Sequence, residues 1–442
     1  MRNIVEKLRS IRRMCLSWAY RPILRALPKV RLRLKVWRYR KFILPRLVER
    51  VSRKEKDRVN VVFLALNISM WRYDGVFRKL QADTRFNPVI LTAMRTNESQ
   101  DEQIADQNQM IEYFFAKGYK VIPGFDANAQ KWLDLHDLAP DIVFYTQQYS
   151  IALAPQYNCD IVKEYALICF APYSLTLVTE EHNYNLEIHN YAWFNFMVSR
   201  YYLDIGRKYS YIGCSNAVPV GYGVGEEIAA AMERCSRDTV WYKVDGRKKV
   251  IWAPHHTIGV CNGFQIGAFL EICDEMLRLR DEYRDSIVFA FKPHPMMLTK
   301  LYREWGKDRA DAYYRNWAEG ENSFLADGTY IDLFAQSDAM IHDSSSFIVE
   351  YIYTNKPVAY TYRKAWLAPS YNEIGTEALK VHYDLHDPSE IKGFFEDVVL
   401  AGKDTLESAR RKFAKDFLND GTGSFSENVV NEIRNGIRTG NG

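Results

Sequence analysis

After residue 58 the chain alternates between continuous runs of apolar residues and amphipathic segments. The apolar runs lack a period-two alternation with polar residues, which is typical of parallel strands buried on both faces. Segments with helical spacing follow them, so this order predicts a parallel sheet covered by helices. In the first half of the chain the runs indicate a doubly wound α/β domain over residues 58–235, with strands within 58–71, 86–94, 141–148 and 165–174.

A second series of the same kind follows a polar linker. It predicts another doubly wound, Rossmann-like domain over residues 245–400 and a helical C-terminal tail over residues 401–442. Its strands are expected within residues 249–259, 286–295, 338–346 and 356–362. Because parallel sheets bind ligands at the carboxyl ends of their strands, two such domains predict a cleft between those ends.

Two further segments are expected to be helical. The sequence "NYAWFNFMVSRYYL" at residues 190–203 predicts a helix whose aromatic stripe lies in the core. The sequence "LYREWGKDRADAYYRNWAE" at residues 301–319 predicts a helix of the second domain.

Composition agrees with two sizeable cores. The chain has 442 residues, of which 47% are hydrophobic and 14% aromatic. Its seven cysteines form no C-x-x-C pair and leave one over, so neither a zinc site nor a disulfide framework is indicated. This cysteine usage favours a reduced, cytosolic compartment.

The net charge of +4 is unevenly distributed along the chain. Met1 to Arg58 contain 20 Lys and Arg against 4 Asp and Glu, so this segment carries +16 and the remainder carries −12. The first 57 residues therefore form a distinct basic segment.

This basic segment is amphipathic at its start. Helical spacing places one set of apolar residues on a single face: Ile4, Leu8, Ile11, Cys15 and Trp18. No run approaches the roughly 18 apolar residues of a spanning helix, and the pattern of a signal peptide is missing. Residues 1–57 are therefore expected to attach the protein peripherally to an anionic membrane surface. A nucleic-acid-binding arm and a merely solubilising tail are the alternatives.

Two loops at predicted strand ends carry candidate chemistry. The loop "DSSS" places Asp343, Ser344, Ser345 and Ser346 between a strand and a helix, where hydroxyl and backbone donors can bind phosphate. An ordinary helix cap would need only one of these residues. The loop "KPHP" adds Lys292 as a phosphate-binding charge and His294 as a donor or acid, and its prolines stiffen both positions.

Together these loops resemble the CDP-glycerol glycerophosphotransferase family of teichoic-acid and capsule enzymes. The resemblance rests on "KPHP" at residues 292–295 and on "DLFAQSDAMIHDSSSFIVEYIYTNKP" at residues 332–357. It implies a GT-B fold, a monotopic membrane attachment, and transfer of a polyol phosphate from a CDP-polyol to a polymeric or lipid-linked acceptor. His294 is then the expected catalytic group of the second domain, facing the serine loop across the donor pyrophosphate.

The first domain departs from the family pattern. An H-G-T-P segment, whose histidine would be the expected base, is missing, and residues 170–193 take its place. His182 and Glu181 are the substitute catalytic candidates, with His189 as a third. His255 and His256 of "WAPHHTIG" are candidates for donor binding. Packing or surface roles remain open for each of these histidines.

The function expected from the sequence is a transferase at the cytoplasmic face of the cell membrane. It uses a CDP-linked donor and a glycan or lipid-linked acceptor, with no metal site, no nucleic-acid partner and no certain cofactor. A GT-B glycosyltransferase or a hydrolysing epimerase that uses a nucleotide sugar is an alternative. A non-catalytic membrane scaffold of the same fold is another.

Overall fold

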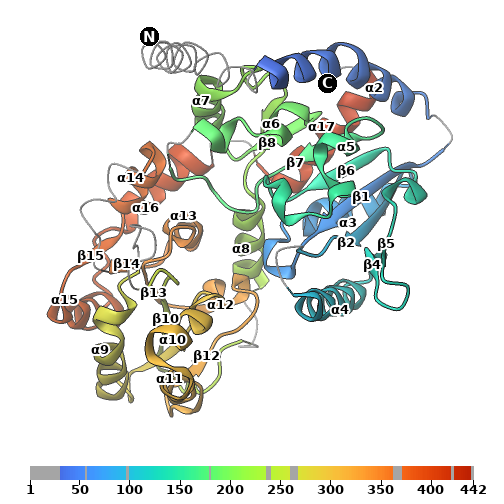
Figure 1. The fold of residues 1–442 in the computed structure, drawn as a ribbon. Coiled ribbons are helices and arrows are strands. Elements are labelled where there is room, and N and C mark those ends of the chain that lie inside the picture. The colour runs from blue at the N-terminus through green and yellow to red at the C-terminus, as the bar shows by residue number, and fades with distance from the viewer. Residues whose placement is uncertain are drawn as a thin grey trace, which may run out of the picture.

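The computed structural model describes residues 30–54, 57–95, 99–178, 181–234, 240–258, 267–361, 371–419 and 423–439, with all side chains except those of residues 181 and 182. Two parallel sheets form the framework of this part of the chain, and helix α8 (Gly223–Arg234) lies between them (Figure 1). The predicted pair of parallel α/β domains is confirmed.

Within the described residues, the sheet of the N-terminal domain has seven strands in the order β3-β2-β1-β6-β7-β8-β9, all parallel. The chain reverses its direction of travel across the sheet between β1 and β6, which is where such sheets open a crevice. Strands β4 and β5 form a separate hairpin. The bounds are β1 Val59–Ala65, β2 Phe86–Thr92, β3 Val121–Pro123, β4 Phe125–Asp126, β5 Lys131–Trp132, β6 Ile142–Tyr145, β7 Leu167–Phe170, β8 Phe194–Met197 and β9 Ala217–Pro219.

The sheet of the C-terminal domain has six strands, counted over the same described residues, in the order β12-β11-β10-β13-β14-β15. All neighbouring pairs are parallel, and the direction of travel reverses between β10 and β13. Its crevice is therefore expected at the carboxyl ends of these two strands. The bounds are β10 Lys248–Ala253, β11 Ile287–Phe291, β12 Ser323–Leu325, β13 Ala339–His342, β14 Val358–Thr361 and β15 Tyr383–Leu385.

Helices connect and cover both sheets (Figure 1). Those of the N-terminal half are α2 Leu44–Ser52, α3 Asp74–Ala82, α4 Gln100–Ala116, α5 Cys159–Val162, α6 Glu187–Tyr191 and α7 Arg200–Tyr209. Those after α8 are α9 Phe269–Glu282, α10 Met297–Trp305, α11 Lys307–Glu319, α12 Ile331–Gln336, α13 Phe347–Glu350, α14 Glu373–Leu379, α15 Pro388–Gly393, α16 Glu407–Phe413 and α17 Phe425–Thr439.

The second half of the basic N-terminal segment belongs to the core of the N-terminal domain. Helical residues 30–38 continue through a π-helical turn η1 (Tyr39–Ile43) into α2. One face of α2 is buried because its apolar residues recur at helical spacing: Leu44, Leu47, Val48 and Val51. The sequence had indicated a separate surface segment, whereas this part packs on the same core as β1 and β6. The apolar face predicted for residues 4–18 lies outside the described residues.

The last helix of the predicted C-terminal tail also returns to the N-terminal domain. Helix α17 lies against α2 and α3 (Figure 1). Its buried side chains Phe425, Val429, Val430 and Ile433 belong to the core of that domain. Arg434 forms an ion pair with Asp83 next to α3, with 2.7 Å between Nη2 and Oδ2. Helix α17 therefore completes the N-terminal domain, whereas α16 packs beside α14 of the second domain.

The two domains share an apolar contact around α8. Tyr202, Tyr222 and Val224 from the N-terminal half lie in one buried cluster with Ile348 and Tyr351 of the second domain.

One glycine of α8 is required for this contact. A Cβ on Gly225 would lie 2.3 Å from the ring of Tyr353 in the short helix η7 (Tyr351–Thr354), so only glycine allows the helices to approach so closely.

Two expected helices are wrong in detail. Residues 190–203 contain strand β8, because a short aromatic run suits a buried strand as well as a helix and periodicity cannot separate the two. Residues 301–319 form two helices, because Gly306 adopts a φ of 82° between α10 and α11. Among the described helices, none is both long and apolar enough to span a bilayer.

Candidate functional site

Three loops of the C-terminal domain meet at the carboxyl ends of β10, β11 and β13. Strand β10 pairs with both of the others, so the residues after these strands lie at one edge of the sheet. These loops carry all the site residues that the sequence predicts in this domain: His255, His256, Lys292, His294, Asp343, Ser344, Ser345 and Ser346.

Asp343 connects two of these loops. Its side chain is 1% exposed, its Oδ1 accepts the backbone N–H of His255 at 2.5 Å, and its Oδ2 accepts that of Ala268 at 2.6 Å. Burial raises the pKa of Asp343 to about 7, although the backbone hydrogen bonds act in the opposite direction. The sequence assigned Asp343 to donor binding. Because backbone groups occupy both of its oxygens, the structure gives it a positioning role behind the loops.

His255, His256 and His294 form a compact cluster of imidazole rings. The ring centroids of His255 and His256 lie 4.3 Å apart, and those of His256 and His294 lie 4.2 Å apart. The third distance, between His255 and His294, is 5.5 Å. The sequence predicted all three as site residues, and the fold brings them together although they come from two loops.

Hydrogen bonds to the Nδ1 atoms determine which nitrogen of two of these rings carries the proton. The Nδ1 of His294 accepts the backbone N–H of Met296 at 3.1 Å. The Nδ1 of His256 lies 2.7 Å from the ammonium of Lys300, which can only donate. In a neutral imidazole the proton is therefore on Nε2 in both His256 and His294.

Hydrogen bonds with Thr257 also place the proton of the neutral His255 imidazole on Nε2. Its Oγ1 accepts the backbone N–H of Gly267 at 2.8 Å and lies 3.0 Å from the Nδ1 of His255. The backbone N–H of Thr257 also donates to this Nδ1, at 3.3 Å. The cluster thus has three Nε2–H groups that can donate hydrogen bonds to an anion.

Burial keeps the three imidazoles neutral near pH 7. It lowers the pKa of His255 to about 3 and that of His294 to about 4, and neighbouring positive charge contributes in both cases. The pKa of His256 is lowered by burial and by the Lys300 ammonium. Without a bound ligand these residues are hydrogen-bond donors and not acids.

Lys292 supplies a positive charge beside the cluster. Its ammonium donates to the carbonyls of Ala326 at 3.3 Å and Gly328 at 3.0 Å, both in the loop after β12. Burial lowers the pKa of Lys292 to about 8, so the side chain is still mostly charged at pH 7.

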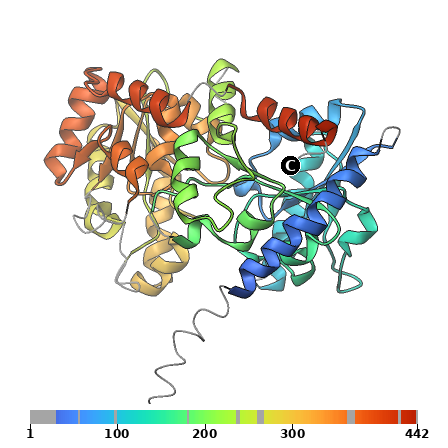
Figure 2. The ribbon, with the colours of Figure 1, turned by 90° about the horizontal axis from the view of Figure 1, so that it is seen from above.

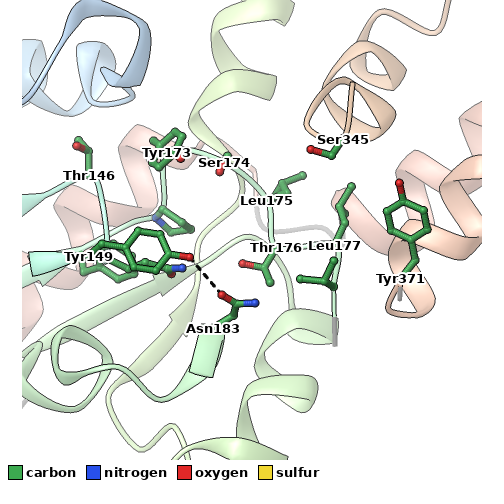
Figure 3. A pocket seen from close by; sticks show the side chains of 14 residues that line it. Thr146, Tyr149, Tyr173, Ser174, Leu175, Thr176, Leu177, Asn183, Ser345 and Tyr371 are labelled. Atoms are coloured by element: carbon green, nitrogen blue, oxygen red, sulfur yellow. Dashed lines mark hydrogen bonds between the residues drawn. The ribbon is translucent and has the colours of Figure 1, made fainter. Parts of the chain in front are cut away.

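The serine loop presents hydroxyl groups at the same edge of the sheet as the histidine cluster. Ser346 is the N-cap residue of α13, but its side chain makes no capping hydrogen bond. Its Oγ lies 3.5 Å from the Oγ of Ser344, whereas Ser345 points toward the other domain (Figure 3). The ordinary-cap interpretation is therefore wrong for the Ser346 hydroxyl.

A cavity of about 290 Å³ lies between Ser345 and the N-terminal domain (Figure 3). The loops after β6 and β7 form its opposite wall, and the Tyr149 hydroxyl donates to Asn183 Oδ1 at 3.3 Å there. No motif indicated the residues of this wall individually, although many of them lie in residues 170–193, the segment that replaces H-G-T-P. Its described polar side chains are hydroxyls and amides, as in the interior of a polyol-binding site: Thr146, Gln148, Tyr149, Tyr173, Ser174, Thr176, Asn183, Ser345 and Tyr371.

The three catalytic candidates predicted in the first domain, Glu181, His182 and His189, lie close in sequence to the residues of this wall. The side chains of Glu181 and His182 lie outside the described residues. His189 is buried, and its Nδ1 accepts the backbone N–H of Leu186 at 3.1 Å at the start of α6. Burial lowers the pKa of His189 to about 4, and the residue is absent from the described lining of the 290 Å³ cavity. It lines a smaller adjoining cavity that shares Phe170, Thr176 and Asn183 with the larger one, so its role as a base stays a prediction.

Sequence reasoning missed a buried polar bridge between the domains. Arg72, in the loop after β1, donates to the hydroxyl of Tyr330 at 2.8 Å. Glu350 of α13 accepts from Tyr330 at 2.7 Å and from the Tyr222 hydroxyl at 2.8 Å. A carboxylate within the apolar helical run "FIVEY" was the signal that could have indicated Glu350.

Within the described part of the chain, no group of three or more His, Cys, Asp or Glu residues is arranged to hold a metal ion.

Comparisons with known proteins place this site in a family. Residues 245–368 match the family model described as CDP-glycerol:poly(glycerophosphate) glycerophosphotransferase. The segment contains the histidine cluster, the "KPHP" loop and the serine loop. No curated protein matches the chain.

Solved structures match over most of the chain at low sequence identity. A variant of the wall teichoic acid polymerase TagF, soaked with CDPG, matches with a TM-score of 0.55 and 13% identity, covering 95% of this chain and 98% of that one. UDP-GlcNAc 2-epimerase from Neisseria meningitidis, bound to UDP-GlcNAc, matches with a TM-score of 0.54 and 14% identity, covering 86% of this chain and 100% of that one.

A third match is the complex of S. aureus MnaA with UDP, with a TM-score of 0.53 and 13% identity, covering 86% of this chain and 96% of that one. At these identities the structural matches establish the GT-B type of fold and nothing about the substrate. Residues 245–368, which carry both motifs and the histidine cluster, match the model of the CDP-glycerol:poly(glycerophosphate) glycerophosphotransferase family, in agreement with the resemblance seen in the sequence.

Proposed function

We propose that this protein transfers a polyol phosphate from a CDP-linked donor to a hydroxyl group of a glycan acceptor in teichoic-acid or capsule synthesis. The observation that carries this proposal is the set of three Nε2–H donors of His255, His256 and His294 beside the serine hydroxyls, inside the family-matched segment. Such a set suits the oxygens of a pyrophosphate. Lys292 adds positive charge at the same place.

In the proposed reaction the acceptor hydroxyl attacks the phosphorus that bears the polyol. A new oxygen–phosphorus bond forms, the bond to the bridging oxygen breaks, and CMP leaves with that oxygen. Negative charge spreads over the phosphoryl oxygens in the transition state, so fixed donors around them lower the barrier. His294 is the proposed catalytic donor, and its backbone N–H donates to the Pro254 carbonyl at 3.2 Å, which holds its loop against the loop after β10.

The acceptor is proposed to lie in the cavity between Ser345 and the N-terminal wall. Hydroxyl and amide side chains there can bind a polyhydroxylic acceptor and orient one of its hydroxyls toward the donor. Glu181 and His182 remain the predicted bases for the acceptor proton. Both follow directly in sequence from the loop that lines the cavity.

We further propose that residues 1–57 attach the protein peripherally to the cytoplasmic face of the membrane, where a lipid-linked acceptor would be available. The exposed apolar side chains of helical residues 30–43 support this: Val30, Leu34, Trp37 and Phe42. The +16 charge of the first 58 residues favours an anionic leaflet.

A donor-binding panel tests the proposed substrate class. Thermal stability should rise with CDP-glycerol or another CDP-polyol, and less with UDP-GlcNAc or a CMP-sugar at equal concentration. His256→Ala should reduce the stabilisation because it removes one Nε2–H donor. Stabilisation by UDP-GlcNAc alone would favour the nucleotide-sugar alternative, and a response to no nucleotide would favour a scaffold.

A further inference from the structure

A groove of about 790 Å³ lies on the N-terminal domain, far in sequence from the loops of the candidate site. It separates the helix of residues 30–43 from the segment that follows α7, and Figure 2 shows this helix in dark blue along the outside of the domain. We call it the N-terminal groove. Its lining residues are Arg33, Val36, Trp37, Arg40, Lys41, Tyr211 and Ile212.

The three cations of the N-terminal groove form no ion pair with any described residue. Arg33 lies over the ring of Tyr211, with 4.8 Å between its Cζ and the ring centroid. Lys41 lies over the ring of Trp37, with its Nζ 5.0 Å from the centroid. Aromatic rings hold these charges in place, and the described part of the chain supplies no counterion for them.

Some other cations of the same segment are paired with acidic side chains of the domain. Lys35 pairs with Asp160 at 3.3 Å, and Lys54 pairs with Asp141 at 2.7 Å. Acidic side chains are thus present along the same side of the domain. None of the described ones pairs with a groove cation.

The proposal depends most on Arg40, a half-buried cation that has no acidic partner among the described residues. Its hydrogen bonds within this part of the chain are two long ones, from Nη1 to the carbonyls of Asn190 and Ala192, both at 3.4 Å. Burial lowers the pKa of Arg40, because its charge has lost water without gaining a carboxylate. A buried cation of this kind is costly unless a ligand anion completes its coordination.

Apolar side chains lie beside the groove on the same helix. Val30, Leu34 and Trp37 recur at helical spacing and are 50%, 61% and 55% exposed. Trp37 belongs both to this apolar strip and to the lining of the groove. An amphipathic ligand could therefore place its anionic part among the cations and its hydrocarbon part along the strip.

We propose that the N-terminal groove is a discrete binding site for the phosphate of an anionic membrane phospholipid. The guanidinium groups of Arg33 and Arg40 and the ammonium of Lys41 bind the phosphate oxygens, and the acyl chains lie along Val30, Leu34 and Trp37. This inference rests on the proposed membrane attachment and does not depend on the transfer reaction. It differs from diffuse attraction because it predicts one specific lipid that is bound by named side chains.

Binding of the full-length protein to vesicles tests the site. Phosphatidylcholine vesicles with and without phosphatidylglycerol are compared for wild type, Arg40→Gln, Arg33→Gln and Arg38→Gln. Arg38 is an exposed cation of the same helix outside the groove, so its loss changes the net charge equally. Loss of one surface cation is expected to lower the partition coefficient for phosphatidylglycerol vesicles about fivefold. For Arg33→Gln and Arg40→Gln the partition coefficient should fall about tenfold further than for Arg38→Gln. Equal losses in all three variants would overturn the site.

Soluble ligands show whether the groove binds a whole phospholipid or only its phosphate group. Titration with a short-chain phosphatidylglycerol below its micellar concentration should give saturable binding of one molecule, which Arg40→Gln abolishes. Inorganic phosphate at the same concentration should give little heat, because it lacks the apolar contacts. Equal binding of inorganic phosphate would overturn the lipid assignment. Transfer to a soluble acceptor should be unchanged in Arg33→Gln, so failure of the groove and failure of the proposed reaction can be distinguished.

Discussion

The backbone N–H of His255 donates a 2.5 Å hydrogen bond to the buried carboxylate oxygen Oδ1 of Asp343. The two residues follow neighbouring strands, β10 and β13, so this bond fixes the histidine loop relative to the serine loop. A preorganised anion site needs such fixed distances, because donors that must move into place stabilise a transition state less.

Replacing Asp343 by Asn should loosen the site. An amide has only one acceptor oxygen, so one of the two backbone N–H groups would face the NH₂ group instead. We expect the free energy of unfolding to fall by about 1–3 kcal/mol and the affinity for the donor to fall as well. Urea denaturation and donor titration measure the two effects. Asp204→Asn, at an exposed site on α7, is the control, and an Asp343→Asn protein that behaves like it would contradict the positioning role.

Replacing His294 by Ala should reduce kcat/KM for transfer by about 10²–10³-fold, as expected for loss of a preorganised donor. His294→Gln should retain more activity, because its NH₂ group can replace the Nε2–H. Folding should be unaffected, since His294 is only partly buried. The exposed His136→Ala is a matched control. Equal activity of His294→Ala and wild type would remove the proposed role.

Donor affinity should fall as pH rises above about 8. The pKa of Lys292 is about 8 in the ligand-free protein, and the negative charge of the donor would raise it, so binding takes up a proton in this range. The affinity for the donor should therefore have its highest value below pH 7 and decrease above pH 8. Calorimetric titrations from pH 6.5 to 9.5 measure the effect. Lys292→Arg should flatten the profile, and a flat wild-type profile would refute the assignment.

The part of the site in the C-terminal domain could be predicted because its residues follow strands in short motifs. The contact between His255 and Asp343 could not, since it depends on β10 and β13 being neighbours despite the strands between them in sequence. Thr146, Tyr149 and Asn183 form no motif because a polar loop residue carries little information about its neighbours. Strand β8 was missed because an aromatic run is compatible with both strand and helix.

The bridge from Arg72 through Tyr330 to Glu350 should stabilise the arrangement of the two domains. Arg72→Met leaves buried acceptors without a donor and removes positive charge near Glu350, so we expect a loss of about 3–5 kcal/mol. The exposed Arg207→Met should change stability by less than about 0.5 kcal/mol. Urea denaturation measures both. A double variant with Glu350→Gln should show non-additive losses, and additive losses would mean that the two residues act independently.

Different serines of the serine loop should bind the two substrates, Ser345 the acceptor and Ser344 with Ser346 the donor. Ser345→Ala is expected to raise the KM for acceptor, because Ser345 lines the interdomain cavity. Ser344→Ala with Ser346→Ala should mainly raise the donor Kd, since each hydrogen bond to a charged group is worth about 1.5–3 kcal/mol. Steady-state kinetics with each substrate varied in turn separate the effects. Equal effects of both variants on both substrates would contradict this division.

Acceptor-dependent release of CMP from CDP-glycerol is the decisive measurement for the proposed transfer reaction. The full-length protein is incubated with CDP-glycerol and a soluble glycan acceptor, and CMP and the extended acceptor are quantified together. We predict one CMP for each phosphodiester formed, with both products formed about 10²–10³-fold more slowly by His294→Ala. CMP release without a new phosphodiester, or turnover of UDP-GlcNAc with no reaction of any CDP-polyol, would contradict it.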